Sequence, residues 1–295
     1  MSRWQIYATG DHHHVVGDAL PELKVLTQAS TGKAFRRIGR FIQLALIGAS
    51  RCAQPQSLPP ATAVYFASGR GDLELMLEIM TQLYRDAQTP KPLNFVNTVS
   101  NAACFYLAQH LGLQSRSNFV CNRHFAFESV LQLAALDLTL GTVDSALIGS
   151  VDIATVPLNE HRQRLALPPD TPMGEGSHWL WLGPINSERP RLGELLAAQH
   201  FADRNDLLAW IRQQNLSGEQ CAISAGQFLT LEHFAQLRNA AGLKNIFDYR
   251  RQRAYYDSHS GAAISSFLGA ATQSDMLLHI NADDEQRYSV MLVRR

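Results

Sequence analysis

Short apolar segments alternate along the chain with segments that are apolar on one side only. Residues 63–67 are a continuous apolar run and residues 145–151 are mostly apolar or small, which is typical of buried strands. Residues 35–51 instead carry apolar side chains at every third or fourth position, which predicts an amphipathic helix. Because strands and helices alternate, the pattern predicts an α/β fold in which helices cover mostly parallel strands.

The same criteria predict the remaining elements. Further strands are expected at residues 4–9, 117–121, 178–182, 192–197, 221–224, 276–281 and 288–294. Further helices are expected at residues 73–83, 102–111, 125–140, 205–214, 230–241 and 262–271. The order of elements in residues 1–184 recurs in abbreviated form in residues 185–295. We therefore expect two halves of one compact domain.

Composition and charge exclude several classes of function. The 26 basic and 26 acidic side chains cancel, and the Arg residues are scattered, so neither nucleic acid nor an anionic membrane is an expected partner. No apolar run is long enough to span a bilayer or to serve as a secretory signal, which predicts a cytoplasmic protein. The four Cys residues are widely separated and are expected to be free thiols: Cys52, Cys104, Cys121 and Cys221.

Three consecutive histidines, His12, His13 and His14, follow the first predicted strand. Adjacent residues on an extended loop point in different directions, and no Cys or carboxylate cluster lies nearby at ligand spacing. The segment is therefore predicted to be a solvated loop, with no metal site.

Four segments carry a resemblance to a known family. Residues 92–101 are similar to the pattern P-x-x-F-x-N-S-V-x-N, residues 146–152 are similar to A-L-V-G-G-x-D/E, and residues 173–176 match M-G-E-G. The helix at 125–140 ends at a Gly, as does the helix that follows the family's nucleophile. In this order the segments resemble the N-terminal half of a β-ketoacyl synthase. The resemblance implies a thiolase-like, layered α-β-α-β-α fold with a shortened C-terminal half.

The family's nucleophile position holds a histidine in this chain. Ketosynthases use a Cys at a strand-to-helix elbow, where the helix N-terminus favours the thiolate. The family has a small residue ten positions later and a Gly seventeen positions later, and counting back from Ala134 and from Gly141 gives His124 both times. Cys121 lies three residues too early and is interpreted as a small buried residue at a strand end. No catalytic Cys is therefore predicted.

The other catalytic groups of the family are mostly missing. The segment at 224–230 contains no His where the family has H-G-T-G-T, and the usual Lys position is Ala254. No G-F-G-G loop follows residue 274. His259, in a segment similar to G-H-T-x-G-A-A, is either a retained catalytic-type histidine or a helix-capping residue. Because such groups act as a unit, we expect little condensing activity.

The resemblance implies a non-catalytic role in a heterodimer. Chain length factors pair with an active ketosynthase subunit and limit chain length, and this chain resembles the short ones of bacterial aryl polyene and type II polyketide systems. The implied partners are an active ketosynthase and an acyl carrier protein, without a cofactor. Residues 94–101 and 117–121 would form the dimer seam, and Phe105 would close the acyl cavity. The predicted tunnel and interface residues are Asn101, Phe105, Phe119, His124 and Phe125.

Two other functions are compatible with the sequence. One is an active or decarboxylating acyltransferase of thiolase fold that uses His124 and His259. The other is a stand-alone module that binds an acyl group or a carrier protein. The first predicts turnover by the isolated chain, and the second predicts a stable homodimer.

Overall fold

The computed structural model describes residues 3–295 except residues 18, 100, 187, 217 and 253. Most elements lie within a few residues of the expected positions, and the α/β class is confirmed. The strands are β1 (Trp4–Val15), β2 (Ala63–Ser68), β3 (Ser117–Cys121), β4 (Ala146–Asp152), β5 (Gly174–Gly183), β6 (Gly193–Phe201), β7 (Cys221–Ala225), β8 (Asn245–Ile246), β9 (Met276–Ala282) and β10 (Tyr288–Arg294). The main helices are α1 (Lys24–Thr31), α2 (Arg40–Ala53), α3 (Leu73–Met80), α4 (Pro92–Asn97), α5 (Ala102–Leu111), α6 (Ala126–Thr139), α7 (Leu158–Arg164), α8 (Arg204–Gln213), α9 (Leu231–Ala241) and α10 (Gly261–Gly269). A π-helical turn, η1 (Thr81–Arg85), continues α3, and a 3₁₀ turn, η2 (Tyr249–Gln252), precedes α10.

The two halves of the chain share one strand topology. The strands are arranged in the order β3-β2-β4-β5-β1-β6-β10-β9-β7-β8. If the strands of each half are numbered one to five along the chain, both halves have the order three, two, four, five, one from the outer edge of the sheet inward. In both halves the fifth strand, β5 or β10, runs antiparallel to its two neighbours, while the other pairs are parallel. A short antiparallel pairing of β1 with β6 joins the halves. The recurrence expected from the sequence is thus an internal duplication of the fold.

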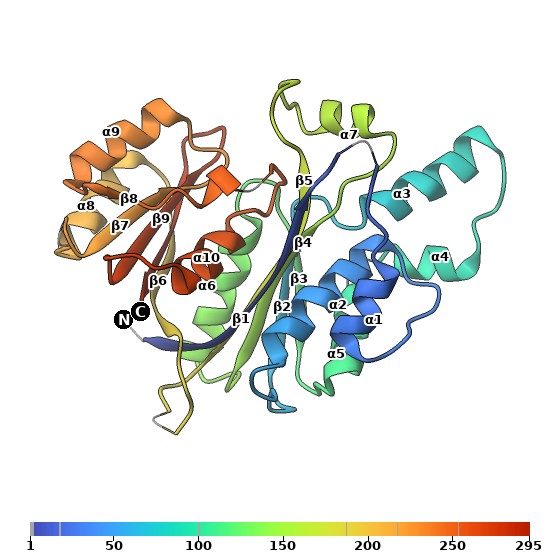
Figure 1. The fold of residues 1–295 in the computed structure, drawn as a ribbon, viewed down its shortest axis with the longest axis horizontal. Coiled ribbons are helices and arrows are strands. Elements are labelled where there is room, and N and C mark those ends of the chain that lie inside the picture. Colours follow the sequence, from blue (N-terminus) through green and yellow to red (C-terminus); the bar gives the residue numbers. More distant parts are fainter. Residues whose placement is uncertain (1–2, 18, 100, 187, 217, 253) are drawn as a thin grey trace.

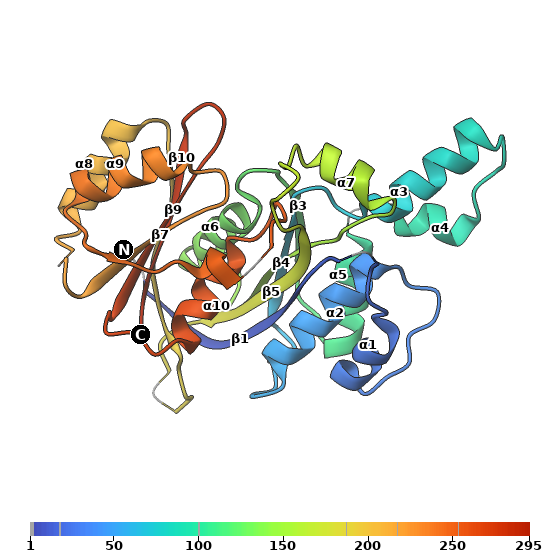
Figure 2. The ribbon, with the colours of Figure 1, turned by 45° about the horizontal axis from the view of Figure 1, so that its top comes forward.

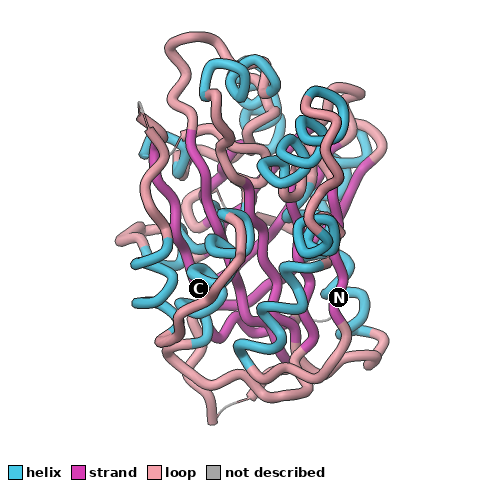
Figure 3. Tube along the Cα trace, turned by 90° about the vertical axis from the view of Figure 1, so that its right-hand side faces the viewer, coloured by secondary structure: helices cyan, strands magenta, loops and turns pink. Residues whose placement is uncertain are grey.

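Two helices fill the space between the two five-stranded portions. Figure 1 shows α6 and α10 at the centre, with α1, α2 and α5 outside the first portion and α8 and α9 outside the second. The turned view of Figure 2 gives the same arrangement, and Figure 3 shows the strands side by side with helices flanking them. The helix α6 contacts β2 and β4 as well as β6 and β10, and α10 contacts β1 and β5 as well as β9. The molecule is therefore layered α-β-α-β-α, as expected.

The burial of the central helices explains why they form where they do. Six apolar side chains of α6 are nearly inaccessible and belong to a core shared with β2, β4 and β10: Ala126, Phe127, Val130, Leu131, Ala134 and Leu138. Burying the four larger side chains, those of Phe127, Val130, Leu131 and Leu138, stabilises a fold by roughly 1.5–3 kcal/mol each. The second half keeps all five strands, although β8 has only two residues. Its abbreviation thus lies in short connections.

The structure corrects the prediction for the triple histidine. The strand β1 continues to Val15, and residues His12, His13 and His14 pair in register with β5. The His14 imidazole contacts the buried carboxylate of Glu175 at 2.9 Å. The predicted solvated loop is therefore wrong, because β5 supplies hydrogen-bonding partners along its whole length. Among the described residues, no group of three or more His, Cys, Asp or Glu side chains is placed to hold a metal ion.

No described helix is both long enough and apolar enough to traverse a lipid bilayer.

Candidate functional site

The candidate site lies at the elbow between β3 and α6. The strand β3 ends at Cys121, and four residues, Asn122 to Phe125, follow before α6 begins at Ala126. The backbone N–H of His124 donates to the Asn122 side chain at 3.3 Å, which fixes the turn. The His124 ring is half-buried, with its edge directed at Phe228 at 4.7 Å and its Nε2 atom 3.2 Å from an Asp284 carboxylate oxygen. The elbow therefore presents an imidazole held by an aromatic ring and a carboxylate.

His259 occupies the corresponding place in the second half. His124 lies two residues before the first residue of α6, and His259 lies two residues before the first residue of α10. The His259 side chain is fully buried, stacked on Tyr249 with ring centroids 5.0 Å apart and edge-on to Tyr256 at 5.0 Å. The duplicated fold thus places one histidine at the start of each central helix.

A buried glutamate connects the starts of the two central helices. Glu128, in the first turn of α6, accepts a hydrogen bond from the Ser260 hydroxyl at 2.9 Å and another from the Asn281 amide at 2.9 Å. The same Asn281 amide donates to the His124 carbonyl oxygen at 3.0 Å. Burial raises the pKa of Glu128, which favours the protonated carboxyl. Glu128 and Asn281 therefore bring the His124 elbow and the segment that carries His259 together.

A further buried histidine lies beside this glutamate. His279 is on β9, with Nδ1 3.3 Å from the Ser224 hydroxyl and Nε2 3.9 Å from the Glu128 carboxyl. Tyr249 stands edge-on to His279 at 5.7 Å. Burial, and to a lesser extent the charge of Arg250, lowers the pKa of His279 to about 3, so its imidazole is neutral near pH 7. The cluster is polar and buried, and hydrogen bonds link Glu128 to Ser260 and Asn281.

Cys121 is placed differently from the prediction. It lies at the end of β3, as expected, but it is exposed, because β3 is the edge strand of the sheet. Its thiol donates a weak hydrogen bond to the Gly69 carbonyl at 3.6 Å. Partial burial, and then the carboxylates of Asp152 and Asp257, raise the pKa of this thiol above its ordinary value. An environment that disfavours the thiolate does not suit a nucleophile.

The other predicted tunnel and interface residues fall into two groups. Phe125 is buried at the start of α6, and the Phe119 ring packs edge-on against Phe66 of the core at 5.2 Å. Asn101 and Phe105 lie on or just before α5 and are exposed, with Phe105 62% accessible. The structure therefore brings Phe125 to the His124 elbow, whereas Phe105 lies on the outer surface.

Sequence reasoning missed five residues around the two histidines: Glu128, Phe228, His279, Asn281 and Asp284. Only Glu128 left a signal, because its carboxylate stands next to Ala126 and Phe127 and before Val130 and Leu131, on the apolar part of the helix pattern. The other four come from the loop after β7 and from β9 and its following turn. Their contacts join residues more than a hundred positions apart, which no local pattern reveals.

The comparisons with known proteins agree on the fold. No family model matches the sequence, and no curated protein matches it. Among solved structures, the ishigamide ketosynthase/chain length factor superposes with a TM-score of 0.79 at 12% identity over 99% of both chains. The complex AntDE:AntF, a type II PKS acyl-carrier protein with its ketosynthase bound to the hexaketide, gives 0.75 at 13% identity over 99% of both chains. A β-ketoacyl synthase from Burkholderia phymatum STM815 gives 0.69 at 11% identity over the full length of both. The chain therefore has the thiolase-type fold of the β-ketoacyl synthases, and the resemblance seen in the sequence is confirmed at the level of the fold.

Replacing His279 by Asn should change how stability depends on pH. The pKa of His279 is about 3 in the folded chain and about 6.5 when unfolded, so its contribution is complete above pH 6.5 and is lost as the pH falls toward 3. The difference in unfolding free energy between wild type and His279→Asn should shrink by up to about 1.4 kcal/mol per pH unit on acidification below 6.5. Urea unfolding at a series of pH values measures it. A difference that stays constant with pH would show that the ring is not held neutral by burial.

Proposed function

We propose that this chain is a chain length factor-like subunit that pairs with an active β-ketoacyl synthase. The observation that carries the proposal is a concentration of exposed apolar side chains beside an unpaired sheet edge. Of the eighteen large apolar side chains exposed in the described part of the chain, nine lie between residues 76 and 105: Met76, Met80, Leu83, Tyr84, Leu93, Phe95, Val96, Val99 and Phe105. We call these nine residues the α3–α5 surface. Exposed apolar clusters of this kind mark interaction sites.

The α3–α5 surface is continuous with the edge of the sheet. The helices α3 and α4 project from the body of the molecule in Figure 1, α4 contacts α5, and α5 contacts β3. Within the described residues, β3 pairs with β2 on one side and with no strand on the other. An open strand edge offers its backbone groups to a strand of another chain. A partner that adds a strand to β3 would also cover the α3–α5 surface.

The His124 elbow supports a non-catalytic role for this subunit. Its imidazole already has a carboxylate and an aromatic neighbour, and the nearest cysteine in sequence, Cys121, has a raised pKa. Condensation needs a thiolate that forms easily and leaves easily. The partner would therefore supply the nucleophile, and an acyl carrier protein would deliver the substrate to that partner.

The second part of the proposal concerns the product that the complex makes. By resemblance, the system is of the aryl polyene or type II polyketide kind, located in the cytoplasm, and the subunit limits how far the acyl chain grows. Phe105 is exposed on α5 next to β3, so it is available to the partner's tunnel in a complex formed along that edge. An aromatic side chain at the end of a tunnel would act by steric exclusion.

The alternative of an acyltransferase that uses His124 and His259 requires both imidazoles to reach one substrate. His259 is fully buried against Tyr249 and Tyr256. A subunit role is therefore favoured over this alternative.

Changing Phe95 to Asp should break the pairing. Phe95 is 64% exposed in the α3–α5 surface, so the substitution should not disturb the fold, but it would bury a charge at the interface. Loss of an aromatic anchor typically costs about 2 kcal/mol or more, which weakens the complex roughly 30-fold. The measurement is co-expression with an active β-ketoacyl synthase, followed by a sizing column.

The matched control for this experiment is Val25→Asp. Val25 is 75% exposed on α1, outside the α3–α5 surface, and the substitution should leave the complex intact. Failure of the wild-type chain to form a complex, or equal effects of the two substitutions, would contradict the proposal.

Changing Phe105 to Ala in the assembled complex should shift the products to longer chains. The smaller side chain removes the steric stop while keeping the helix, because Ala is a strong helix former. Mass spectrometry of the products released by the complex measures the shift. Unchanged chain lengths would remove Phe105 from the proposed limiting role without affecting the pairing.

A further inference from the structure

The strand β6 has an open edge beyond its short pairing with β1. On one side, residues 197–201 of β6 pair with β10. On the other side, β1 pairs only with residues 193–195, because its first residue, Trp4, lies opposite Leu195. Within the described residues, no strand pairs with residues 197–201 on that side. Every second residue of this segment therefore directs its backbone N–H and C=O groups away from β10, toward the open side.

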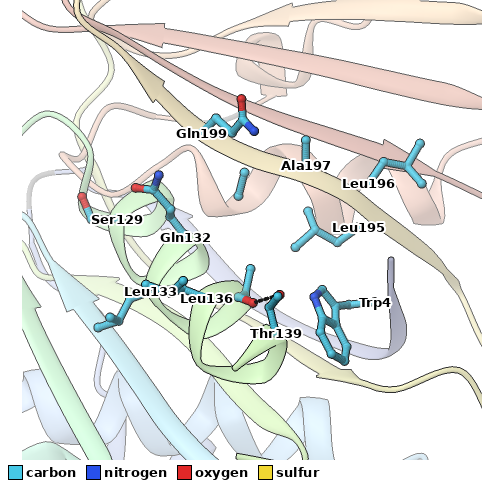
Figure 4. A pocket seen from close by; sticks show the side chains of 12 residues that line it. Trp4, Ser129, Gln132, Leu133, Leu136, Thr139, Leu195, Leu196, Ala197 and Gln199 are labelled. Atoms are coloured by element: carbon cyan, nitrogen blue, oxygen red, sulfur yellow. Dashed lines mark hydrogen bonds between the residues drawn. The ribbon is translucent and has the colours of Figure 1, made fainter. Parts of the chain in front are cut away.

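A groove, which we call the α6–β6 groove, runs along this open edge. Its main part has a volume of about 590 Å³. Residues of β6 form one wall and residues of α6 the other, and Trp4 lies at one end beside Thr139 (Figure 4). A second cavity of about 400 Å³ adjoins the main part, since Ser129 lines both, and it continues the β6 wall through Phe201 and Ala202. The open edge is thus accessible along its length.

The sequence of β6 lacks the features that protect open strand edges. Such edges are usually very short or carry charged side chains or Pro, which discourages other strands from pairing with them. The segment Leu195–Phe201 is Leu-Leu-Ala-Ala-Gln-His-Phe and contains no Pro, Lys, Arg, Asp or Glu. By contrast, the outer edge strand β8 has only two residues and follows Lys244. The edge of β6 is therefore suited to pairing with a further strand.

The walls of the groove limit the kind of strand that fits. None of the side chains that line its main part is charged. Ala197 and Ala198 are small, so a second backbone has room to approach β6. From α6, Leu133 and Leu136 offer apolar contacts, and Gln132 offers an amide. Successive side chains of a strand point to opposite faces, so apolar residues that contact α6 should alternate with uncharged polar residues that face solvent.

We propose that an extended, uncharged peptide segment of another polypeptide docks in the α6–β6 groove and adds a strand to β6. Strand addition binds through main-chain hydrogen bonds, and alternate side chains supply specificity. A purely aliphatic ligand would cover backbone groups of residues 197–201 without pairing them, whereas a peptide backbone pairs with them. The site is separate from the edge of β3, so the proposal goes beyond the pairing proposed above and does not depend on it.

The first experiment selects ligands from a phage library of short random peptides, with the purified full chain as the target. We expect enrichment of peptides in which apolar and uncharged polar residues alternate. Fluorescence anisotropy then measures the affinity of the enriched peptides. Gln132→Trp and Ala198→Trp place a large ring in the groove from α6 and from β6. Each should weaken binding about tenfold or more, because the ring occupies the site.

The control for this experiment is Leu231→Trp. Leu231 is 75% exposed on α9, outside the groove, so this variant should bind the enriched peptides as wild type does. Gln132→Trp leaves β6 untouched, so the test remains valid if Ala198→Trp disturbs the strand.

The second experiment tests whether the peptide pairs as a strand. Two analogues of the tightest peptide carry N-methyl groups on alternate backbone nitrogens, one analogue on the odd residues and the other on the even residues. An added strand directs only alternate N–H groups toward β6. One analogue should therefore bind as the parent does, and the other about tenfold or more weakly. On peptide binding, hydrogen exchange should slow at alternate amides of residues 197–201 and stay unchanged in β8.

The outcomes separate this proposal from its rivals. It is overturned if wild type enriches no peptides relative to Gln132→Trp, or if both N-methyl analogues bind equally. If wild type dimerises on a sizing column and Gln132→Trp does not, the occupant is a second copy of this chain, and the assignment to another polypeptide is wrong. Phe95→Asp lies outside the groove and should leave peptide binding unchanged, so this proposal and the ketosynthase pairing stand or fall independently.

Discussion

The arrangement of the candidate site depends on one buried carboxyl group. Glu128 accepts hydrogen bonds from Ser260, at the start of α10, and from Asn281, on β9, while Asn281 also holds the His124 carbonyl. These bonds join both central helices and both halves of the duplicated fold at a single point. Buried polar groups that lose such a partner cost about 1–3 kcal/mol each, so the geometry of the elbow is coupled to the protonation and position of Glu128.

The side chains of the candidate site differ from those of the α3–α5 surface in the contacts that they make within the chain. At the elbow the side chains contact one another: His124 lies against Phe228 with its Nε2 atom 3.2 Å from Asp284, and His279 Nδ1 lies 3.3 Å from the Ser224 hydroxyl. On the surface the situation is reversed, because the α3–α5 surface and the edge of β3 lack partners within the described chain. The α3–α5 surface and the β3 edge are therefore the places where the proposed pairing would form.

The sequence predicted the elements well because their patterns are local. The strand at 117–121 and the helix at 102–111 have the bounds of β3 and α5, and the count that placed a histidine at the elbow agrees with the start of α6. The continuation of β1 through His12–His14 was missed, because it depends on pairing with β5. Exposure of Cys121 was missed because strand order, which makes β3 an edge, is not encoded locally.

At the candidate site, local sequence patterns predict even less than they do for the fold. His124 and His259 could be found from motifs, but the groups around them could not. Asn281 and Glu128 are 153 positions apart in the chain, and they meet only because β9 of the second half packs against the central helix layer. Phe228 and Asp284 likewise reach the elbow through loops whose conformation no periodicity specifies.

The claim that chemistry belongs to a companion subunit is tested most directly by intact-mass spectrometry. The isolated chain is incubated with acyl and malonyl carrier proteins under conditions that load a ketosynthase, and its mass is followed over time. The account predicts an unchanged mass, because the elbow offers an imidazole and the Cys121 thiol is disfavoured as a thiolate. A stable acyl adduct mapped to Cys121, or turnover that depends on His124, would contradict it.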